Sequence, residues 1–289
     1  MLAATLDAKE PLPAAHEPYL WERLAVDDFI AAVKDCEGVC LVPIGCLEKH
    51  GYQLPLGTDA LVAAEVCRRA ASKEKAVVFP FSPFGHVYGV QHKAGTIALK
   101  ANTLLLLLDN LCDELSRNGL KKIVFLNDHG GNNPLMNHFV RERLGERHDY
   151  AVYHVFLGDL CYARKDEIAR RAGLAAFPEG GHGDLVETAQ VMAMDESLVH
   201  MERVVVSETQ PLGRLAALDK AGVGVSVGWY ADYPHQSAGD PSAATPELGR
   251  WILEKNSDDL ARIIRLVRED RVTAALLQEY YDACGMPSR

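Results

Sequence analysis

The chain has 289 residues, of which 48% are hydrophobic and 24% charged, so it is long enough to bury a sizeable core in one large domain or two small ones. A net charge of −10 without a basic stripe argues against nucleic-acid binding, and the longest apolar run, Leu104–Leu108, is too short to span a bilayer. Seven scattered cysteines and an N-terminus without a basic and then apolar segment argue against secretion, so we expect a soluble, cytoplasmic protein.

The predicted elements begin after an arm at residues 1–18, which contains three prolines and no clear period. Short apolar runs then predict four buried strands, at residues 39–44, 77–81, 122–126 and 150–157. Amphipathic or capped segments predict helices, at residues 27–33, 59–71, 102–119, from about 134, from about 185, and at 246–268. This alternation predicts a mostly parallel sheet with helices on both faces. No linker or internal repeat divides the chain, so we expect a single domain over residues 19–289.

The first segment with a chemical pattern follows the strand at residues 39–44. Glu48 and His50 are two positions apart, so in an extended segment their side chains project to the same side. Asp59 begins the next helix at the carboxyl end of the strand, where open α/β sheets bind their ligands. Two carboxylates and an imidazole there suit zinc, manganese or iron. A surface pair at Glu48 and His50, with Asp59 only as a helix cap, is an equally simple interpretation.

Two further segments place histidines in glycine-rich loops. His129 follows an apolar run and precedes Gly130 and Gly131, which let the backbone approach a ligand closely. The double glycine could also be a tight turn or a weak phosphate loop, although it lacks the spacing and the lysine of a P-loop. His182 lies in the loop before the helix from about residue 185, and Glu187 follows about a turn and a half later. By themselves these two could be an ordinary loop histidine and a carboxylate favoured by the helix dipole.

Together these segments resemble the signature blocks of the creatininase (creatinine amidohydrolase) family. The resembling strings are PIGCLEKHG followed by LPLGTD, then NDHGGNN, then GGHGDLVET. His92–Thr96 resembles a fourth block that usually reads His-x-Pro-Gly-Thr, and Gly239–Gly249 resembles the C-terminal pattern of the family. The blocks run in order from residue 43 to about residue 249, so the resemblance covers most of the chain.

The resemblance implies a three-layer α/β/α sandwich that holds two divalent metal ions per chain, commonly zinc with manganese or iron. Glu48 and His129 match ligands of one metal, and His50 matches a ligand of the other. Asp59 matches the carboxylate that bridges the two metals. Two such metals lower the pKa of a bridging water and polarise the carbonyl group that the water attacks. Family members also tend to be hexamers, so we expect a homo-oligomer.

The resemblance also implies roles for residues around the metals. Some members take a metal ligand from a glutamate at the position of Gly131. Here that ligand could come instead from Glu187, which is a candidate both as a metal ligand and as a catalytic residue. His182 matches the proposed proton shuttle, a role that suits a histidine because its ordinary pKa is about 6.5. Six positions match substrate-contacting blocks of the family: His92, Gly95, Thr96, Gly130, Gly131 and Asn132.

The departures from the family pattern concern the substrate. Lys49 replaces the usual glutamine and Ala94 the usual proline. Creatinine-cleaving members resemble His-Tyr-Glu-Asn where this chain has HGGN, and they carry tryptophans on substrate-covering loops that the stretches near Phe156 and Gly180 lack. We therefore predict a hydrolase that cleaves a non-peptide carbon–nitrogen bond of a small cyclic amide, lactam or formamide other than creatinine.

Three alternatives remain open. Within the family, the chain could be a deformylase or a peptide-trimming member. A cysteine hydrolase could use Cys46 with Glu48 and Lys49, but it would leave His129 and Asp59 without a role. A non-catalytic, oligomeric metal- or ligand-binding protein is the third alternative, and the near-complete set of matched ligands argues against it.

Overall fold

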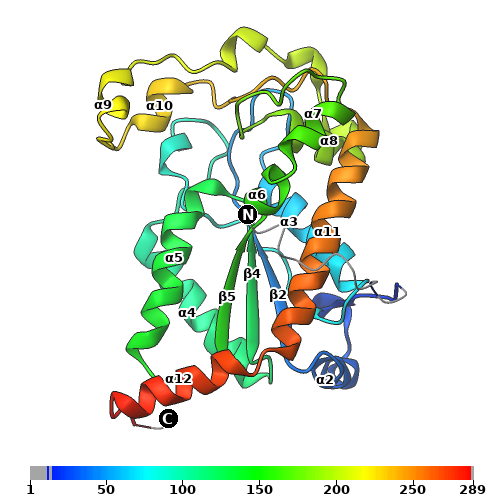
Figure 1. Ribbon diagram of the computed structural model, residues 1–289, viewed down its shortest axis with the longest axis vertical. Coiled ribbons are helices and arrows are strands. Elements are labelled where there is room, and N and C mark those ends of the chain that lie inside the picture. Colours follow the sequence, from blue (N-terminus) through cyan, green and yellow to red (C-terminus); the bar gives the residue numbers. More distant parts are fainter. Residues whose placement is uncertain (1–11, 13–14, 288–289) are drawn as a thin grey trace.

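The computed structural model describes residue 12 and residues 15–287, so most of the arm predicted at residues 1–18 lies outside the described part. A five-stranded parallel sheet with the order β1-β3-β2-β4-β5 forms the centre of the molecule (Figure 1). In that order the strands are Tyr19–Leu20, Val77–Val78, Val39–Ile44, Lys122–Asn127 and Ala151–Phe156. The mostly parallel sheet predicted from the sequence is confirmed.

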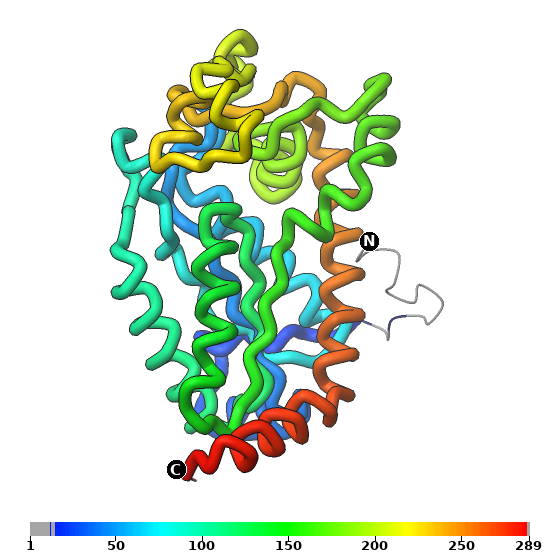
Figure 2. The backbone as a smooth tube through the Cα atoms, turned by 60° about the vertical axis from the view of Figure 1, so that its left-hand side comes forward, coloured from blue at the N-terminus to red at the C-terminus, as the bar shows by residue number. Residues whose placement is uncertain are grey.

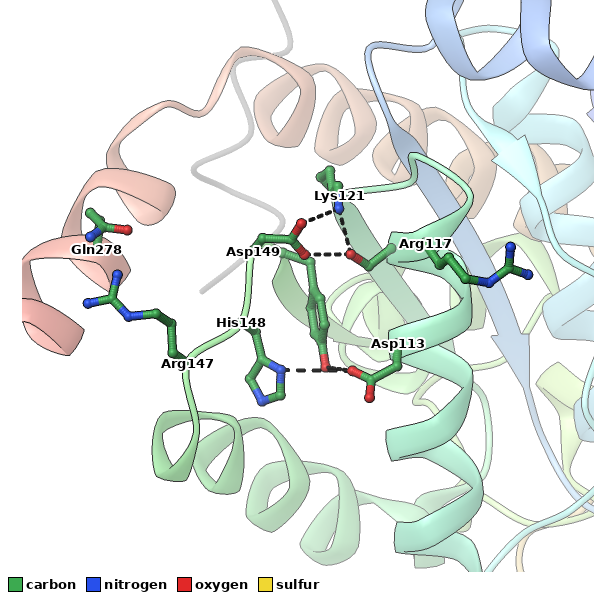
Figure 3. Close-up of a pocket in the computed structure, with 9 residues that line it drawn as sticks. Asp113, Arg117, Lys121, Arg147, His148, Asp149 and Gln278 are labelled. Carbon is green, nitrogen blue, oxygen red and sulfur yellow. Dashed lines mark hydrogen bonds and ion pairs between the residues drawn. The ribbon is translucent and has the colours of Figure 1, made fainter. Parts of the chain in front are cut away.

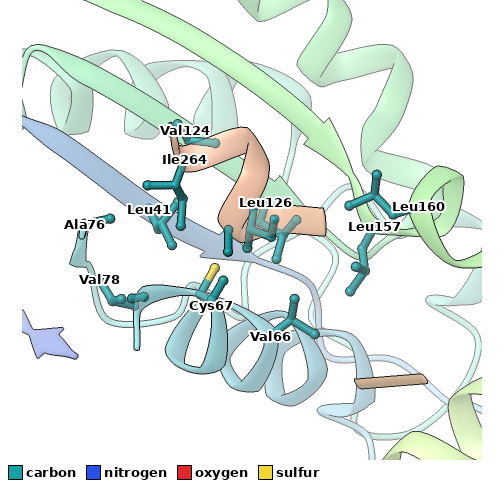
Figure 4. Close-up of a cluster of buried hydrophobic side chains, with 14 of the residues drawn as sticks. Leu41, Val66, Cys67, Ala76, Val78, Val124, Leu126, Leu157, Leu160 and Ile264 are labelled. Carbon is teal, nitrogen blue, oxygen red and sulfur yellow. The ribbon is translucent and has the colours of Figure 1, made fainter. Parts of the chain in front are cut away.

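Helices cover both faces of the sheet. One face carries α3 (Thr58–Ala71), α8 (Leu185–Met194) and α11 (Pro246–Glu269), and the other carries α2 (Val26–Asp35), α4 (Ala101–Arg117) and α5 (Asn133–Glu142). Alternate residues of β2 supply the two cores: Leu41 packs in the α3–α11 cluster shown in Figure 4, and Val42 packs against α4 and α5. The three-layer α/β/α fold of a single domain is therefore confirmed.

Five further α-helices complete the described part of the chain, and the first of them follows β5 directly and packs in the core. They are α6 (Leu157–Tyr162), α7 (Lys165–Arg171), α9 (Ala216–Lys220), α10 (Gly228–Asp232) and α12 (Val272–Ala283). Figures 1 and 2 show α9 and α10 in yellow at one end and α12 in red at the other. No helix among the described residues is both long and apolar enough to cross a membrane.

Several element boundaries differ from the sequence prediction. The strand expected at residues 77–81 ends at Val78, because Pro80 has no N–H to continue the ladder. Helix α4 begins at Ala101 and α2 at Val26, and neither has a side-chain cap, so the caps expected at residues 27–28 and 102–103 are wrong. The short strand β1 and helices α6, α7, α9, α10 and α12 were not predicted.

The sheet brings two of the predicted segments together at one edge. Strands β2 and β4 are neighbours and end in register, with Ile44 beside Asn127. The loop after β2 turns back tightly onto α3, and a Cβ at Gly45 would lie 2.3 Å from the backbone nitrogen of Ala60. This close approach places Asp59, in the first turn of α3, beside the loops that follow β2 and β4.

Candidate metal centre

Six side chains singled out in the sequence meet at the carboxyl end of the sheet. They come from the loop after β2, the start of α3, the loop after β4 and the start of α8: Glu48, His50, Asp59, His129, His182 and Glu187. His50 is completely buried, and Glu48 and Asp59 are 1% and 2% exposed. Glu187 is positioned by the helix cap, since Asp184 accepts hydrogen bonds from the backbone N–H groups of Val186 and Glu187.

Asp59 lies between two histidines. Its Oδ1 is 2.6 Å from His50 Nε2, and its Oδ2 is 3.1 Å from His129 Nδ1. His129 Nδ1 is also 2.9 Å from Glu48 Oε1, and His50 Nε2 is 3.9 Å from Glu187 Oε2. One carboxylate thus contacts two separate groups of candidate ligands, His129 with Glu48 and His50 with Glu187.

Each of the three histidines uses one ring nitrogen to bind a backbone carbonyl. His50 Nδ1 donates to the Glu48 carbonyl at 3.2 Å, and His129 Nε2 donates to the His86 carbonyl at 3.3 Å. His182 Nε2 donates to the Lys49 carbonyl at 2.8 Å. The second nitrogen of each ring faces the carboxylates, and in the neutral ring this nitrogen carries the lone pair that a metal would bind.

The donor atoms fit divalent cations. Both carboxylate oxygens of Glu48 and the Nε2 atom of His50 are buried without a hydrogen-bond partner among the described residues. Three overlapping groups of side chains each place their ligand atoms close enough together to hold one ion. They are Cys46, Glu48, Asp59 and His129; Glu48, His50 and His182; and His50, Asp59 and Glu187. Asp59 belongs to the first group and to the third. Buried carboxylates and imidazoles are preferred ligands of zinc, manganese and iron, so the cluster fits a divalent metal.

The electrostatics of the cluster also favour cations. Burial alone would raise the pKa of Glu48, but the facing histidines outweigh burial and lower it to about 2. Burial alone would lower the pKa of His129, but the charges of Glu48 and Asp59 raise it to about 10. Burial raises the pKa of Glu187 to about 8 against the opposing charge of His50. Glu187 is therefore neutral at pH 7 in the metal-free site, and a bound cation would offset the cost of burying its charge.

Cys46 is close to the cluster but is not an activated nucleophile. Its Sγ donates a hydrogen bond to Asp59 Oδ2 at 3.1 Å. Burial, together with the charges of Asp59 and Glu48, raises the pKa of this thiol well above its ordinary value. Because the thiolate is the reactive form, this environment argues against a cysteine hydrolase.

A cavity of about 70 Å³ lies beside the cluster. Asp59, His129, His182 and Glu187 form one part of its wall. The rest of the wall comes from the loop after β4, the end of β5 with α6, the loop before α8, and α8 itself: Asp128, Gly130, Phe156, Leu157, Gly158, Cys161, Tyr162, Gly181, Val186 and Gln190. We refer to this cavity as the reaction chamber, since it contacts the candidate ligands.

The segment around α10 covers His182. Trp229 packs edge-on against the His182 ring, with 5.4 Å between the ring centroids, and its indole N–H donates to Gln236 Oε1 at 2.6 Å. Lys49, which stands between Glu48 and His50 in the sequence, donates to the His235 carbonyl at 2.5 Å. Trp229 was not predicted from the sequence, because a contact across 47 residues leaves no local pattern.

The six predicted substrate-contacting residues lie in different places, and only Gly130 lines the reaction chamber. His92 is exposed and packs against Tyr230, with 4.9 Å between the ring centroids. A Cβ on Gly95 would meet Leu56, and the Thr96 hydroxyl donates to the Val90 carbonyl at 3.2 Å.

The other two residues of that set support the loop after β4. Asn132 is buried, and its Oδ1 accepts a hydrogen bond from the backbone N–H of His86 at 2.8 Å. Gly131 fits tightly, since a Cβ there would lie 2.4 Å from His129 Nε2. A substrate role for these residues stays a prediction, and the structure gives Gly131 and Asn132 a role in holding His129 and the segment around His86.

A larger surface groove lies at the opposite end of the sheet (Figure 3). Its charged side chains bind one another: Lys121 pairs with Asp149, and the Tyr150 hydroxyl donates to Asp113 at 3.1 Å. It lies at the amino ends of β4 and β5, away from the edge where parallel sheets bind ligands. The candidate functional site is therefore the buried cluster.

Comparison with known proteins supports this assignment. Residues 22–264 match the family model for creatininase, described as creatinine amidohydrolase. Creatinine amidohydrolase of Pseudomonas putida is 28% identical over 190 residues, which cover 60% of this chain and 70% of that protein. The mycofactocin precursor peptide peptidase of Mycobacterium ulcerans (strain Agy99) is 28% identical over 242 residues, which cover 78% of this chain and 84% of that protein.

A solved structure gives the same result. The crystal structure of creatinine amidohydrolase (creatininase) superimposes with a TM-score of 0.72 at 25% identity, covering 88% of this chain and all of that one. The family resemblance seen in the sequence and the expected enzyme class, a hydrolase of carbon–nitrogen bonds other than peptide bonds, are thereby confirmed. The chain belongs to the creatininase family of amidohydrolases.

Proposed function

We propose that this protein hydrolyses a carbon–nitrogen bond of a small, non-peptide amide with the help of two divalent cations. The observation that carries the proposal is the position of Asp59, whose two oxygens contact His50 and His129 separately. Glu48 and His129 would hold one cation, His50 and Glu187 the other, and Asp59 both. Zinc is the first expectation for both sites, with manganese or iron as alternatives.

The bound cations would supply an activated water and polarise the carbonyl group under attack. The residues of the chain orient the ligands and move the proton. His182 Nε2 is fixed by the Lys49 carbonyl, so Nδ1 is the nitrogen that faces the cluster, 3.9 Å from Glu48 Oε1. Burial and the charge of His50 lower the pKa of His182 to about 4, so its ring is neutral at pH 7 and able to accept a proton. We propose that it transfers this proton to the leaving nitrogen.

At the second cation site, Glu187 can supply the ligand that some family members take from a glutamate at position 131. The glutamate that some members carry is replaced by Gly131, which has no side chain, while Glu187 Oε2 lies 3.9 Å from His50 Nε2. The Gly183 backbone N–H donates to the same oxygen at 2.5 Å and orients it. These contacts support Glu187 as the ligand that completes the second site.

The reaction chamber favours a small substrate. A cavity of about 70 Å³ has room for roughly five water molecules, which suits a small ring or a formamide. The similarity to a peptide peptidase makes a peptide-trimming or deformylating enzyme the second candidate. For a peptide substrate, the segment around Trp229 and His235 would have to move away from His182 and Lys49.

The test combines metal analysis with activity. Protein stripped by a chelator and reloaded with zinc or manganese is offered lactams, hydantoins, formamides and short peptides. We expect two cations per chain and hydrolysis of at least one small amide that disappears with the chelator. Glu187→Ala should retain one cation, and Glu167→Ala, a matched control at a partly exposed position of α7, should retain both. Full activity in metal-free protein would overturn the proposal, and two bound cations without any hydrolysis would favour a non-catalytic binding protein.

We further propose that the chain assembles with copies of itself, with a hexamer as the first expectation, and works in the reducing cytoplasm. Exposed apolar side chains concentrate in the segment that contains α9 and α10: Val205, Val206, Leu212, Leu218, Val223, Val225, Val227 and Tyr230. Patches of this kind support contact between protein chains. Light scattering of the purified protein measures the number of chains directly.

A further inference from the structure

Gln190 is a polar residue on a helix whose other buried positions are mainly apolar. It lies on α8, is 3% exposed, and has Ala189 and Val191, both fully buried, as its neighbours. A buried amide without a hydrogen bond costs about 1–3 kcal/mol, so such a residue is retained where something pairs with it.

No described residue pairs with the amide nitrogen of Gln190. Its Nε2 atom is buried and has no hydrogen-bond partner in the part of the chain that the structure describes. Gln190 is also one of the residues that line the reaction chamber. It follows Glu187 by three positions on α8, which places both side chains on the same face of the helix. Gln190, with its unpaired amide nitrogen, and the candidate metal ligand Glu187 are therefore both wall residues of the same small cavity.

We propose that Gln190 selects the substrate by donating a hydrogen bond from Nε2 to a second carbonyl group of the amide. This inference rests on the proposed function, because it assumes that the first carbonyl is the one attacked at the metal centre. The substrate class that it names is a small cyclic imide or ureide, in which an N–H lies between two carbonyl groups.

Other walls of the chamber match such a ring. Phe156 and Tyr162 supply aromatic surface for a flat ring, and the Tyr162 hydroxyl is already committed, since it donates to Asp184 Oδ2 at 3.1 Å. Asp128 also lines the chamber and offers carboxyl oxygens to the N–H between the carbonyls. A lactam has only one carbonyl, so it would leave the Gln190 donor unpaired and lose affinity.

The experiment compares two five-membered rings, succinimide and 2-pyrrolidinone, which differ by one carbonyl group. Hydrolysis adds water across one ring C–N bond and releases an open-chain product in each case. We expect the zinc-loaded protein to prefer succinimide and Gln190→Met to lower the ratio of kcat/KM for the two rings by about 10- to 100-fold. Gln278→Met, a matched change on the exposed face of α12, should leave the ratio unaltered. Removal of an unpaired buried donor should leave the melting temperature unchanged or higher, so the variant is expected to fold.

Calorimetric binding of both rings to the zinc-loaded protein separates this inference from the proposed function. If the rings are hydrolysed but Gln190→Met keeps the wild-type ratio, the role of Gln190 is overturned and the proposed function stands. If neither ring is hydrolysed, the proposed function fails for small cyclic amides. In that case, tighter binding of succinimide than of 2-pyrrolidinone, lost in Gln190→Met, still supports the role of Gln190. Equal binding of the two rings, or binding of neither, overturns it.

Discussion

His50 Nε2 lies 2.6 Å from Asp59 Oδ1, and both residues are almost completely buried. The contact does not have hydrogen-bond geometry, since His50 Nε2 has no hydrogen-bond partner among the described residues. The ring nitrogen and the carboxylate oxygen therefore face one region of the site, as two ligands of a shared cation do. This contact joins the loop after β2 to the start of α3.

Asp59→Ala should remove both cations, because each of the two ligand groups would lose a shared carboxylate oxygen. Elemental analysis after dialysis against zinc is the measurement, with an expected change from two cations per chain to none. Asp166→Ala, at an exposed position of α7, should keep both cations. An Asp59→Ala protein that keeps one cation would show that Asp59 does not bridge.

Cys46→Ser should keep most of the activity in the presence of metal. A serine hydroxyl can donate the same hydrogen bond that Cys46 Sγ gives to Asp59 Oδ2 at 3.1 Å. Steady-state kinetics and metal content are measured on the same preparation. Complete loss of turnover with both cations still bound would instead make Cys46 the nucleophile.

His182→Ala should leave the cations bound while turnover falls by about 10²- to 10⁴-fold, because the leaving nitrogen loses its proton donor. Metal content distinguishes the possible roles. If occupancy falls together with activity, His182 is a ligand; if neither changes, it is an ordinary loop residue. The pH–rate profile is a second readout, since the limb that reports His182 should be missing in the variant.

Gly131→Ala should weaken metal binding by about 10- to 100-fold, whereas Gly130→Ala should not. A Cβ on Gly131 would lie 2.4 Å from His129 Nε2 and 2.9 Å from the His86 carbonyl oxygen, so it would break the hydrogen bond between them. At Gly130 a Cβ would meet nothing within 4 Å. Zinc titration of the two variants measures their affinities for zinc and compares the same substitution at neighbouring positions. Equal zinc affinities would show that the hydrogen bond to the His86 carbonyl does not orient His129.

Asp270 should stabilise the junction between α11 and α12. Its Oδ1 accepts from the backbone N–H groups of Val272 and Thr273, and its Oδ2 accepts from the Tyr153 hydroxyl at 2.8 Å. Loss of these hydrogen bonds in Asp270→Ala should cost about 1 kcal/mol of unfolding free energy. Urea unfolding in the presence of a chelator measures the difference without a contribution from bound metal.

The same residue predicts a pH dependence. Hydrogen bonds, that of the Thr273 side chain above all, lower the pKa of Asp270 to about 2. A carboxyl with a lowered pKa stabilises the fold above its unfolded value of about 4 and loses that effect as the pH falls toward 2. The stability difference between the wild type and Asp270→Asn should therefore shrink over that range, and a constant difference would contradict the assignment.

The parts of the fold that the sequence predicted have local signals. The run at residues 39–44 is a continuous apolar segment, the run at 122–126 is apolar after Lys122, and both are strands in the structure. The rule that ligands bind at the carboxyl ends of parallel strands placed Asp59 at a ligand site, and the family resemblance implied that His50 and His129 belong to the same metal centre. They are close because β2 and β4 are neighbours, which the sequence alone did not establish.

The parts that were missed depend on contacts distant in the sequence. Trp229 contacts His182 because the segment that contains α10 folds over the site, and no periodic pattern in the sequence predicts that contact. Gln190 had a weak local signal, because it lies one turn after Glu187 on a predicted helix. Its burial beside a cavity depends on how α8 packs against α6 and the loop after β4. Helix α12 lacked a strong apolar stripe, and only Tyr281 of its residues is buried.

The three histidines of the centre are oriented by the main chain. In each ring, the nitrogen that does not face the carboxylates donates to a backbone carbonyl group, that of residue 48, 86 or 49, and no other side chain takes part in those bonds. The side chains of Lys49 and His86 can therefore vary during evolution without loosening the imidazoles. Residues of the chamber wall such as Gln190 can vary in the same way. This separation allows one ancestral catalytic apparatus to be inherited intact while its descendants diverge in the molecules that they accept.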